Sequence, residues 1–352
     1  MNAAASPGWL QYGPMTLLTH ADYIRKIRAD IPAQAFRPAP AKLLRMLVCL
    51  VLICGAYVAF RFSPPLPVRI GLSVFIGHTL VCLAFLTHEL AHGSIVRARG
   101  PRYGLEYFLW ALLFVPATVW RRVHNHTHHT HASTPRDPDR AFMASEESAW
   151  TRFYTRLFYP NRDGPAWNPM VALHWIPYVI RNIVAVFWPS SLPFCFAPAK
   201  PRYTHRQRWA VASELAGIGA VQAGVFWMVG ADWVNYLWAG PGAYLVTSAV
   251  AMAYVFTNHF LNPLIPESDP VLGTTSLVVP PVLDRIHTNF SLHTEHHLFP
   301  GMNSDYYAVV SESLRKNFPE RYNRIGLFAA WKHLWKNEKF MPGIGGTDGK
   351  TG

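Results

Sequence analysis

Charged residues are scarce in this sequence. Asp, Glu, Lys and Arg make up 15% of its 352 residues, whereas 51% of the residues are hydrophobic. Ordinary soluble domains carry about 25% charged residues. The shortage argues against a chain whose whole surface faces water, and it indicates that part of the surface faces lipid. Mean hydropathy is only mildly positive, so a large polar part must accompany the apolar segments.

Cysteine is also rare, and no two cysteines form a C-x-x-C pair. The four are Cys49, Cys54, Cys82 and Cys195, and three of them lie in apolar runs. We expect them to be reduced, buried small hydrophobes. The chain also lacks a rubredoxin-type cysteine motif, a complete G-x-G-x-x-G nucleotide fingerprint and a His-Pro-Gly-Gly haem signature. It therefore carries no electron-donor module that the sequence reveals.

Two further absences concern the partners and location of the chain. No charged segment followed by an apolar core opens the N-terminus, so no cleavable signal is expected. The net charge is +12, yet the basic residues form no stripe with interleaved aromatics, which argues against nucleic-acid binding. Positive charge on the cytoplasmic segments of a membrane protein explains the excess more simply.

Four segments are apolar and long enough to span a bilayer, which takes about 20 residues each. They are Leu43–Phe60, Val68–Thr87, Trp209–Gly230 and Tyr236–Thr257. The Ser63–Pro67 segment joins the first two as a tight, helix-breaking turn. Gly240-Pro241-Gly242 should kink or delay the start of the fourth. With no linker or internal repeat, we predict a single all-α integral membrane domain over residues 1–352.

Two shorter apolar stretches are ambiguous. Leu105–Trp120 is short, and Met170–Trp188 carries His174, Pro177 and Arg181. We interpret both as interfacial or re-entrant helices, with spanning as the alternative.

The charge distribution predicts the orientation. The connections after the first and third spans hold only Arg61, Arg69 and Asp232. All other lysines and arginines lie in residues 1–42, 88–208 and 258–352, which are therefore predicted to be cytoplasmic. Two helical hairpins then enter the membrane, and a cytoplasmic helical cap carries most of the polar mass. We expect an integral protein of the inner (plasma) membrane with its active site on the cytoplasmic side.

The 17 histidines are unevenly placed, and three clusters stand out: H-E-L-A-H at 88–92, H-N-H-T-H-H at 124–129, and H-T-E-H-H at 293–297. On an α-helix, side chains at i and i+4 share a face. His88 and His92 can thus reach one metal, and His124 and His128 repeat their spacing. Each cluster alone has an ordinary reading: a polar helix cap, a loose tag-like tract, or a surface patch.

Together the clusters predict a metal centre, because all three fall on the predicted cytoplasmic side and His259 lies where the fourth span ends. Imidazole suits iron, zinc and copper, and no cysteine or dense carboxylate set competes. The candidate ligands are too many for one tetrahedral zinc and suit two metals with four or five nitrogens each. They are His88, His92, His124, His128, His129, His259, His293, His296 and His297.

The ordered pattern H-x-x-x-H, H-x-x-x-H-H and H-x-x-H-H around four spans resembles the membrane fatty acid desaturase and hydroxylase superfamily. Trp120-Arg121, Asp137-Pro138-Asp139 and His297-Leu298-Phe299-Pro300 match flanking words of its boxes. The resemblance runs from about Leu43 to Tyr307. It implies two iron ions held by the nine histidines, molecular oxygen as co-substrate and a fatty acyl or similar hydrocarbon substrate.

The resemblance leaves the product open. Fatty acid desaturation is our choice, and the alternatives are fatty acid or alkane hydroxylation, oxidative decarboxylation of a fatty acid to a terminal alkene, and carotenoid ketolation. Turnover would need an external donor: a ferredoxin, a rubredoxin or a b-type cytochrome with its reductase. A cationic cytoplasmic face would attract acidic carriers.

Carboxylates and amides near the boxes are candidates to orient the ligand imidazoles through their second ring nitrogen. They are Glu89, Asn125, Asp137, Asp139, Asn258, Asn262, Asn289 and Glu295. Capping or solvation explains several of them equally well. His126 could compete with His124 or be a bystander, and His131 and His287 are expected to support the site or face solvent.

Two other classes of protein compete with the oxidative reading. The first cluster spells H-E-x-x-H, the zinc protease signature, with Glu89 as general base and His88 and His92 on zinc. That account leaves the other two clusters without a role. A metal transporter would place polar ligands near the middle of its spans, where His78 is the only histidine. An isolated buried histidine is more often a hydrogen-bonded structural residue.

Overall fold

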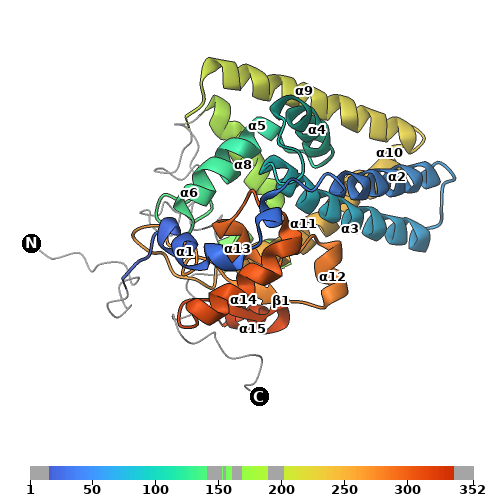
Figure 1. The fold of residues 1–352 in the computed structure, drawn as a ribbon. Helices are drawn as coiled ribbons and strands as arrows, with labels where there is room; N and C mark the ends of the chain where they lie inside the picture. Colours follow the sequence, from blue (N-terminus) through green and yellow to red (C-terminus); the bar gives the residue numbers. More distant parts are fainter. Residues whose placement is uncertain (1–15, 141–152, 154–155, 161–168, 189–201, 337–352) are drawn as a thin grey trace, which may run out of the picture.

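The computed structural model describes residues 16–140, 153, 156–160, 169–188 and 202–336. Within these ranges the chain is almost entirely helical (Figure 1). The helices that can cross a membrane are α2 (Lys42–Phe60), α3 (Leu66–Ala91), α9 (His205–Met228) and the continuous run Trp233–His259. That run is built from α10 (Trp233–Leu237), a π-helical turn (Trp238–Gly242) and α11 (Ala243–His259). The prediction of an all-α membrane protein with four spans is confirmed.

The outer faces of the spans expose large apolar side chains. On α2, Leu47 is 55% exposed, Val51 61% and Val58 42%, at spacings of four and seven residues that form one helix face. A soluble protein rarely exposes such a continuous apolar stripe, and lipid is the solvent that accommodates it. Cys54 belongs to this stripe and is exposed, so the prediction that it is buried is wrong. Cys49 is half-buried and Cys82 buried, whereas Cys195 lies outside the described residues.

Two span boundaries differ from the prediction for local reasons. α9 begins at His205, four residues before the predicted Trp209, because Thr204 and Gln207 form a capping box that starts the helix there. α3 continues past Thr87 to Ala91, because protein partners rather than water satisfy its last polar side chains. The break at Gly240-Pro241-Gly242 takes the form of the π-helical turn, with Pro241 inside it.

The two ambiguous apolar stretches form short helices. α4 (Arg99–Leu112) is followed by α5 (Ala117–Trp120), and the chain from Ala117 to His131 is bent by 105° relative to α4. Such a bend fits a broken or re-entrant segment. The second stretch forms a 3₁₀ turn (Pro169–Leu173) and α8 (Trp175–Phe187), which is too short to span alone. α9 lies across α4 and α5 (Figure 1).

The centre of the bundle is the contact between α3 and α11, which pack together more extensively than any other pair. Gly77 permits this approach, because a Cβ there would collide with the backbone oxygen of Ala243. Thr247 then donates a hydrogen bond to the Gly77 carbonyl at 2.9 Å. Close contact here sets the distance between the helix ends that carry His88 and His259.

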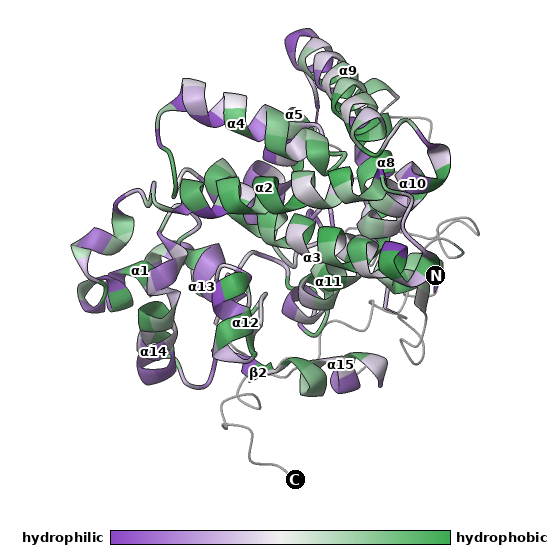
Figure 2. Ribbon diagram, turned by 90° about the vertical axis from the view of Figure 1, so that its right-hand side faces the viewer, coloured by the Kyte–Doolittle hydropathy of each residue, from purple (hydrophilic) through white to green (hydrophobic). Residues whose placement is uncertain are grey.

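The remaining helices gather on one side of the bundle, which we call the polar side. They are α1 (His20–Ile27), two short 3₁₀ turns (Arg28–Asp30 and Ala33–Phe36), α12 (Pro281–Ile286), α13 (His293–Leu298), a 3₁₀ turn (Ser304–Tyr306), α14 (Tyr307–Asn317) and α15 (Leu327–Trp335). Figure 2 shows hydrophilic stretches on α13 and α14, whereas α2 is largely hydrophobic.

The only β-strands in the part of the chain that the structure describes form a small parallel sheet. β1 (Ser276–Val278) pairs with β2 (Arg324–Gly326), with Leu277 opposite Ile325. The backbone N–H of Leu277 also donates a hydrogen bond to the Ser291 carbonyl at 2.8 Å. The sheet thereby supports the segment that leads into α13.

Candidate metal centre

The first histidine box occupies the last turn of α3. His88 and His92 lie one turn apart with ring centroids 4.9 Å from each other, as their i, i+4 spacing predicts. Glu89 lies between them in the sequence, and its carboxylate accepts a hydrogen bond from Lys42 Nζ at 2.8 Å. Both partners of this ion pair are about 5% exposed. The pair ties the start of α2 to the end of α3 and so fixes the box.

The second box does not form the predicted α-helix. Residues Arg121–His128 are π-helical, and α6 (His129–His131) continues from them. A π-helix repeats with i→i+5 hydrogen bonds, so His124 shares a face with His129 rather than with His128. The prediction from i, i+4 spacing is therefore wrong here. His124 and His129 turn to one group of imidazoles and His128 turns to another.

The third box lies on α13, beside the end of α11. His293 Nε2 is 2.8 Å from His259 Nε2, so the third box meets the end of the fourth span. His296 turns away from them, with its Nε2 3.1 Å from His129 Nε2. The histidines of this one helix therefore contact two different sets of imidazoles.

The nine histidines form two adjacent groups. The five-histidine group contains His88, His92, His124, His129 and His296, whose nearest ligand atoms all lie within 4.8 Å of one another. The four-histidine group contains His128, His259 and His297, which meet the same limit, and His293 through its contact with His259. The second and third boxes contribute to both groups, whereas α3 contributes only to the five-histidine group and α11 only to the four-histidine group.

The donor atoms suit a pair of metal ions. The Nε2 atoms of His92 and His297 are buried and have no hydrogen-bond partner among the described residues, so each is free to bind an ion. Burial and the neighbouring imidazoles lower the pKa of His293, His296 and His297 well below the usual value. These rings are neutral at pH 7, the state in which imidazole ligates metals. An all-nitrogen set of nine fits iron better than a single tetrahedral zinc.

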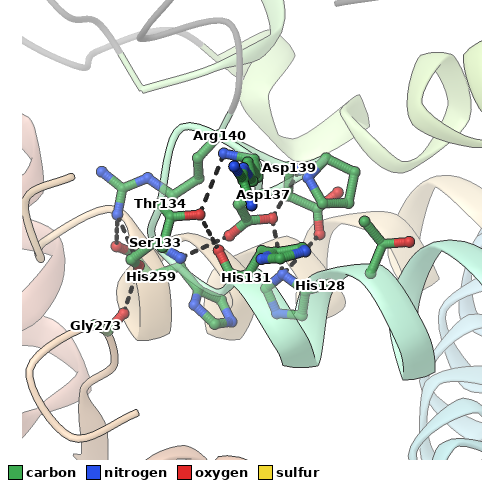
Figure 3. A network of polar contacts seen from close by, with 12 residues as sticks. His128, His131, Ser133, Thr134, Asp137, Asp139, Arg140, His259 and Gly273 are labelled. Atoms are coloured by element: carbon green, nitrogen blue, oxygen red, sulfur yellow. Dashed lines mark hydrogen bonds and ion pairs between the residues drawn. The ribbon is translucent and has the colours of Figure 1, made fainter. Parts of the chain in front are cut away.

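Two carboxylates orient His128, as Figure 3 shows. His128 Nδ1 lies 3.0 Å from Asp137 Oδ1 and 3.4 Å from Asp139 Oδ2. A carboxylate only accepts, so Nδ1 carries the proton and Nε2 keeps its lone pair for an ion. Burial raises the pKa of Asp139 to about 6. Burial also acts on Asp137, but His128 and two backbone N–H groups outweigh it and lower the pKa of Asp137.

One orienting residue has no signal in the sequence. Tyr307, the first residue of α14, places its hydroxyl 3.1 Å from His296 Nδ1. It lies ten residues beyond the third box, and no spacing rule links it to the metal ligands. Among the described residues it is the side chain that holds the second nitrogen of a histidine in the five-histidine group.

The other predicted orienting residues contact different partners. Asn125 donates to the Ala91 carbonyl, Asn289 to the Ser304 carbonyl and Asn262 to the Asn258 carbonyl. These are backbone contacts that hold the box-bearing segments together. The side-chain atoms of Asn258 are buried without a hydrogen-bond partner among the described residues, and none of the four amides meets a ligand ring.

The two predicted glutamates also contact residues other than the candidate ligands. Glu295 accepts hydrogen bonds from Ser276 Oγ at 2.6 Å and from the Tyr322 hydroxyl, and burial raises its pKa. Glu89 is bound to Lys42. Of the eight predicted orienting residues, only Asp137 and Asp139 therefore contact a candidate ligand in the described chain.

Three histidines near the boxes stay outside both groups. His126 is exposed, because the π-helix turns it away, and it does not compete with His124. His131 is half-buried and lies in neither group. His287 is buried against His78, so it does not face solvent, and His78 is not isolated.

An apolar cavity opens beside the two groups. His88, His124 and His293 line it, together with Trp110 and Trp120. Its walls continue along α3 and α11.

Ala84 on α3 and Thr247 and Ala251 on α11 lie in the membrane-spanning part of those walls. From Thr247 to His259 the helix rises about 18 Å. The cavity therefore reaches from the histidines into the depth of the bundle, and its lining is mostly aromatic and aliphatic.

The protease alternative does not fit this geometry. A zinc protease needs the glutamate of H-E-x-x-H beside the metal-bound water. The Glu89 carboxylate is instead paired with Lys42 Nζ at 2.8 Å. The two other clusters, which that account leaves unused, complete the same centre.

Four apolar spans with clustered histidines at their ends and an apolar cavity beside them are typical of one class of integral membrane protein, the membrane-bound oxidative enzymes. The sequence model of the fatty acid desaturase family matches residues 63–328. The match covers more than half of the chain, and the chain belongs to the fatty acid desaturase family. Family membership makes it an oxidoreductase.

Individual relatives are distant but extensive. An endoplasmic-reticulum omega-6 fatty acid desaturase from Brassica juncea is 22% identical over 334 residues, covering 90% of this chain and 86% of the relative. A delta(12) fatty acid desaturase from Vernicia fordii is 25% identical, covering 75% and 70% of the two chains. An sn-1 oleoyl-lipid 12-desaturase from Picosynechococcus sp. is 22% identical, covering 84% and 83%.

Proposed function

We propose that this protein introduces a double bond into a fatty acyl chain, using two iron ions and molecular oxygen. The observation that carries the proposal is the convergence of nine imidazoles, in groups of five and four, beside one apolar cavity that five of them line. The relatives' names supply the substrate class. Each histidine group would hold one iron ion.

The iron ions would supply the oxidising power that breaking an unactivated C–H bond requires. The protein's own part is to bind, orient and exclude water. Asp137 and Asp139 fix the ring of His128, and Tyr307 fixes that of His296. The apolar walls of the cavity keep water from the reacting carbon atoms.

An acyl chain fits this cavity chemically, because it needs apolar contact along its length and no hydrogen bonds. Ala84, Thr247 and Ala251 are small side chains on the facing helices α3 and α11, and they leave room for the chain between them. Phe85 and Phe290 stack with centroids 4.1 Å apart beside His88. Together they would position the reacting carbons against the imidazole groups.

Electrons must come from outside the chain, and we propose a soluble carrier that docks on the polar side. The segments predicted to be cytoplasmic, residues 1–42, 88–208 and 258–352, hold most of the net charge of +12, which favours an acidic partner such as a ferredoxin. By the same charge rule we infer that these segments face the cytoplasm. A rate of turnover that does not change with ionic strength would contradict electrostatic docking.

The test compares acyl products in a host that expresses the wild type, His128→Ala or His126→Ala. His128 lies in the four-histidine group, and His126 is an exposed ring in the same tract. We expect new unsaturated acyl chains with the wild type and with His126→Ala, and none with His128→Ala. Purified wild-type protein should carry about two irons per chain, as the two groups imply.

The product mass separates the remaining activities. A product that has lost a hydrogen pair supports desaturation, and one that has gained an oxygen atom supports fatty acid or alkane hydroxylation. A terminal alkene would indicate decarboxylation, and a ketolated carotenoid would indicate a different substrate. One zinc and no iron per chain would overturn the di-iron proposal whatever the product.

A further inference from the structure

A second cluster of metal-binding side chains lies apart from the nine histidines. His78 and Cys82 are one turn apart in the middle of α3, and His287 follows α12. One ligand atom from each of the three lies within 4.8 Å of the others. Neither the desaturase reaction nor the two histidine groups uses any of them.

The contact between the two imidazoles resembles the contacts inside the metal centre. His287 Nε2 lies 3.2 Å from His78 Nε2. Among the described residues, the other imidazole pairs in such contact are His88 with His124, His259 with His293 and His129 with His296, at 2.8–3.1 Å. All three join candidate iron ligands. Two nitrogens bound to one tetrahedral zinc lie about 3.3 Å apart, given Zn–N bonds of about 2.0–2.1 Å.

The surroundings hold His287 in the orientation that a ligand needs. The Tyr254 hydroxyl lies 2.8 Å from His287 Nδ1, which leaves Nε2 for an ion. His287 and Cys82 are buried, at 2% and 6% exposure. The Phe85 ring covers His287 with centroids 5.5 Å apart. The ligands thus come from α3 and the α12–α13 connection, and the orienting hydroxyl comes from α11.

We propose that His78, Cys82 and His287 bind one thiophilic metal ion, Zn²⁺ or Cu⁺, as a third metal site distinct from the iron centre. A thiolate with two imidazoles suits these ions. The iron centre has no sulfur donor, so the two sites differ in the class of ion that they select.

The site would act as a clamp on the third histidine box. His287 lies six residues before His293, and Phe290 between them stacks on Phe85 of α3. An ion that joins His287 to His78 and Cys82 would anchor this segment to the membrane helix that also carries His88. Structural metal ions contribute folding free energy in this way.

The experiment measures metals per chain in the purified full-length protein, as wild type, Cys82→Ser, His287→Asn and Cys54→Ser. Cys54 is the matched control, because it lies on α2 and is exposed. We expect about one zinc or copper per chain beside the iron in the wild type and in Cys54→Ser. Loss of an outer partner alone lowers metal affinity about 10–100-fold, so Cys82→Ser and His287→Asn should lose the third ion.

Cobalt gives a second readout that iron and activity do not influence. Co²⁺ bound to Cys82 should show a sulfur-to-cobalt charge-transfer band, which an all-nitrogen centre cannot produce. The band should appear in the wild type and in Cys54→Ser, and it should be absent in Cys82→Ser. Retention of iron in that variant shows that it still folds.

The identity of the ion follows from the metal analysis, since zinc and copper are counted separately. Either ion, dependent on Cys82, supports the proposal. Wild-type protein with iron alone and no cobalt band overturns it and leaves His78 and His287 as a hydrogen-bonded pair. The iron count of the same wild-type sample tests the di-iron proposal separately.

Discussion

The two histidine groups are built from the same boxes but are supported differently. In the four-histidine group, His128 is held by two carboxylates, and Asp137 is fully buried. In the five-histidine group, the partner of His296 is the neutral hydroxyl of Tyr307. The nearest carboxylate on α3, Glu89, is turned to Lys42 instead.

This difference teaches that the protein places negative charge beside one metal position and not beside the other. A hydrogen bond to a charged group contributes about 1.5–3 kcal/mol, and a neutral one about 0.5–1.5 kcal/mol. We therefore expect the four-histidine position to hold its ion more tightly. It would be the first to fill and the last to empty.

Removal of one ligand from either group should have the largest effect. We expect His124→Ala, in the five-histidine group, and His297→Ala, in the four-histidine group, each to abolish desaturation, because the reaction needs both ions. Iron should fall from about two to about one per chain in each variant, since the groups share no ligand. Loss of all iron from His124→Ala would show that the groups do not bind independently.

Breaking the Lys42–Glu89 pair should mainly affect stability. Lys42→Met leaves the Glu89 carboxylate buried and unpaired, and loss of one partner of a buried ion pair costs about 3–5 kcal/mol. Thermal unfolding of the purified protein measures this. The double variant Lys42→Met/Glu89→Gln should recover most of the loss, and equal destabilisation in both variants would contradict a direct role for the pair.

Asp137→Asn tests the charge beside the four-histidine group. We expect iron affinity at that position to fall about 10–100-fold, while the other position keeps its ion. Stepwise chelation followed by iron counting measures the two affinities. In the wild type the last iron to leave should be the tight one, and in this variant the order should reverse or the two steps should merge.

Tyr307→Phe is the counterpart in the five-histidine group and should have a smaller effect. It removes one neutral hydrogen bond, worth about 0.5–1.5 kcal/mol, which corresponds to about a 2- to 12-fold loss of affinity. The same chelation series measures it. A loss as large as that of Asp137→Asn would break the comparison between charged and neutral support.

His126→Ala should have the smallest effect of all. Its ring is exposed and lies outside both groups, so iron content and product should match the wild type. Any loss of iron would indicate that the π-helical turn of the second box can shift.

The sequence reveals much of this protein because its signals are local. Runs such as residues 42–60 must be helical in lipid, since every backbone polar group there needs an internal partner. The i, i+4 spacing of His88 and His92 on such a helix leaves little choice about their common face. The order of the three boxes also identifies the family.

Other features depend on contacts between segments that are far apart in the chain. Tyr307 meets His296 only because α14 folds back on α13. Spacing could not show that the second box is π-helical, and that change separates His128 from His124.

The sequence by itself therefore determined the spans, the family and the set of nine histidines. Only the tertiary structure decided how they divide into five and four, which carboxylates support them, and that His78 and Cys82 meet His287. The physical reason is that periodicity reports the face of one helix, whereas a metal site is made where several helices converge.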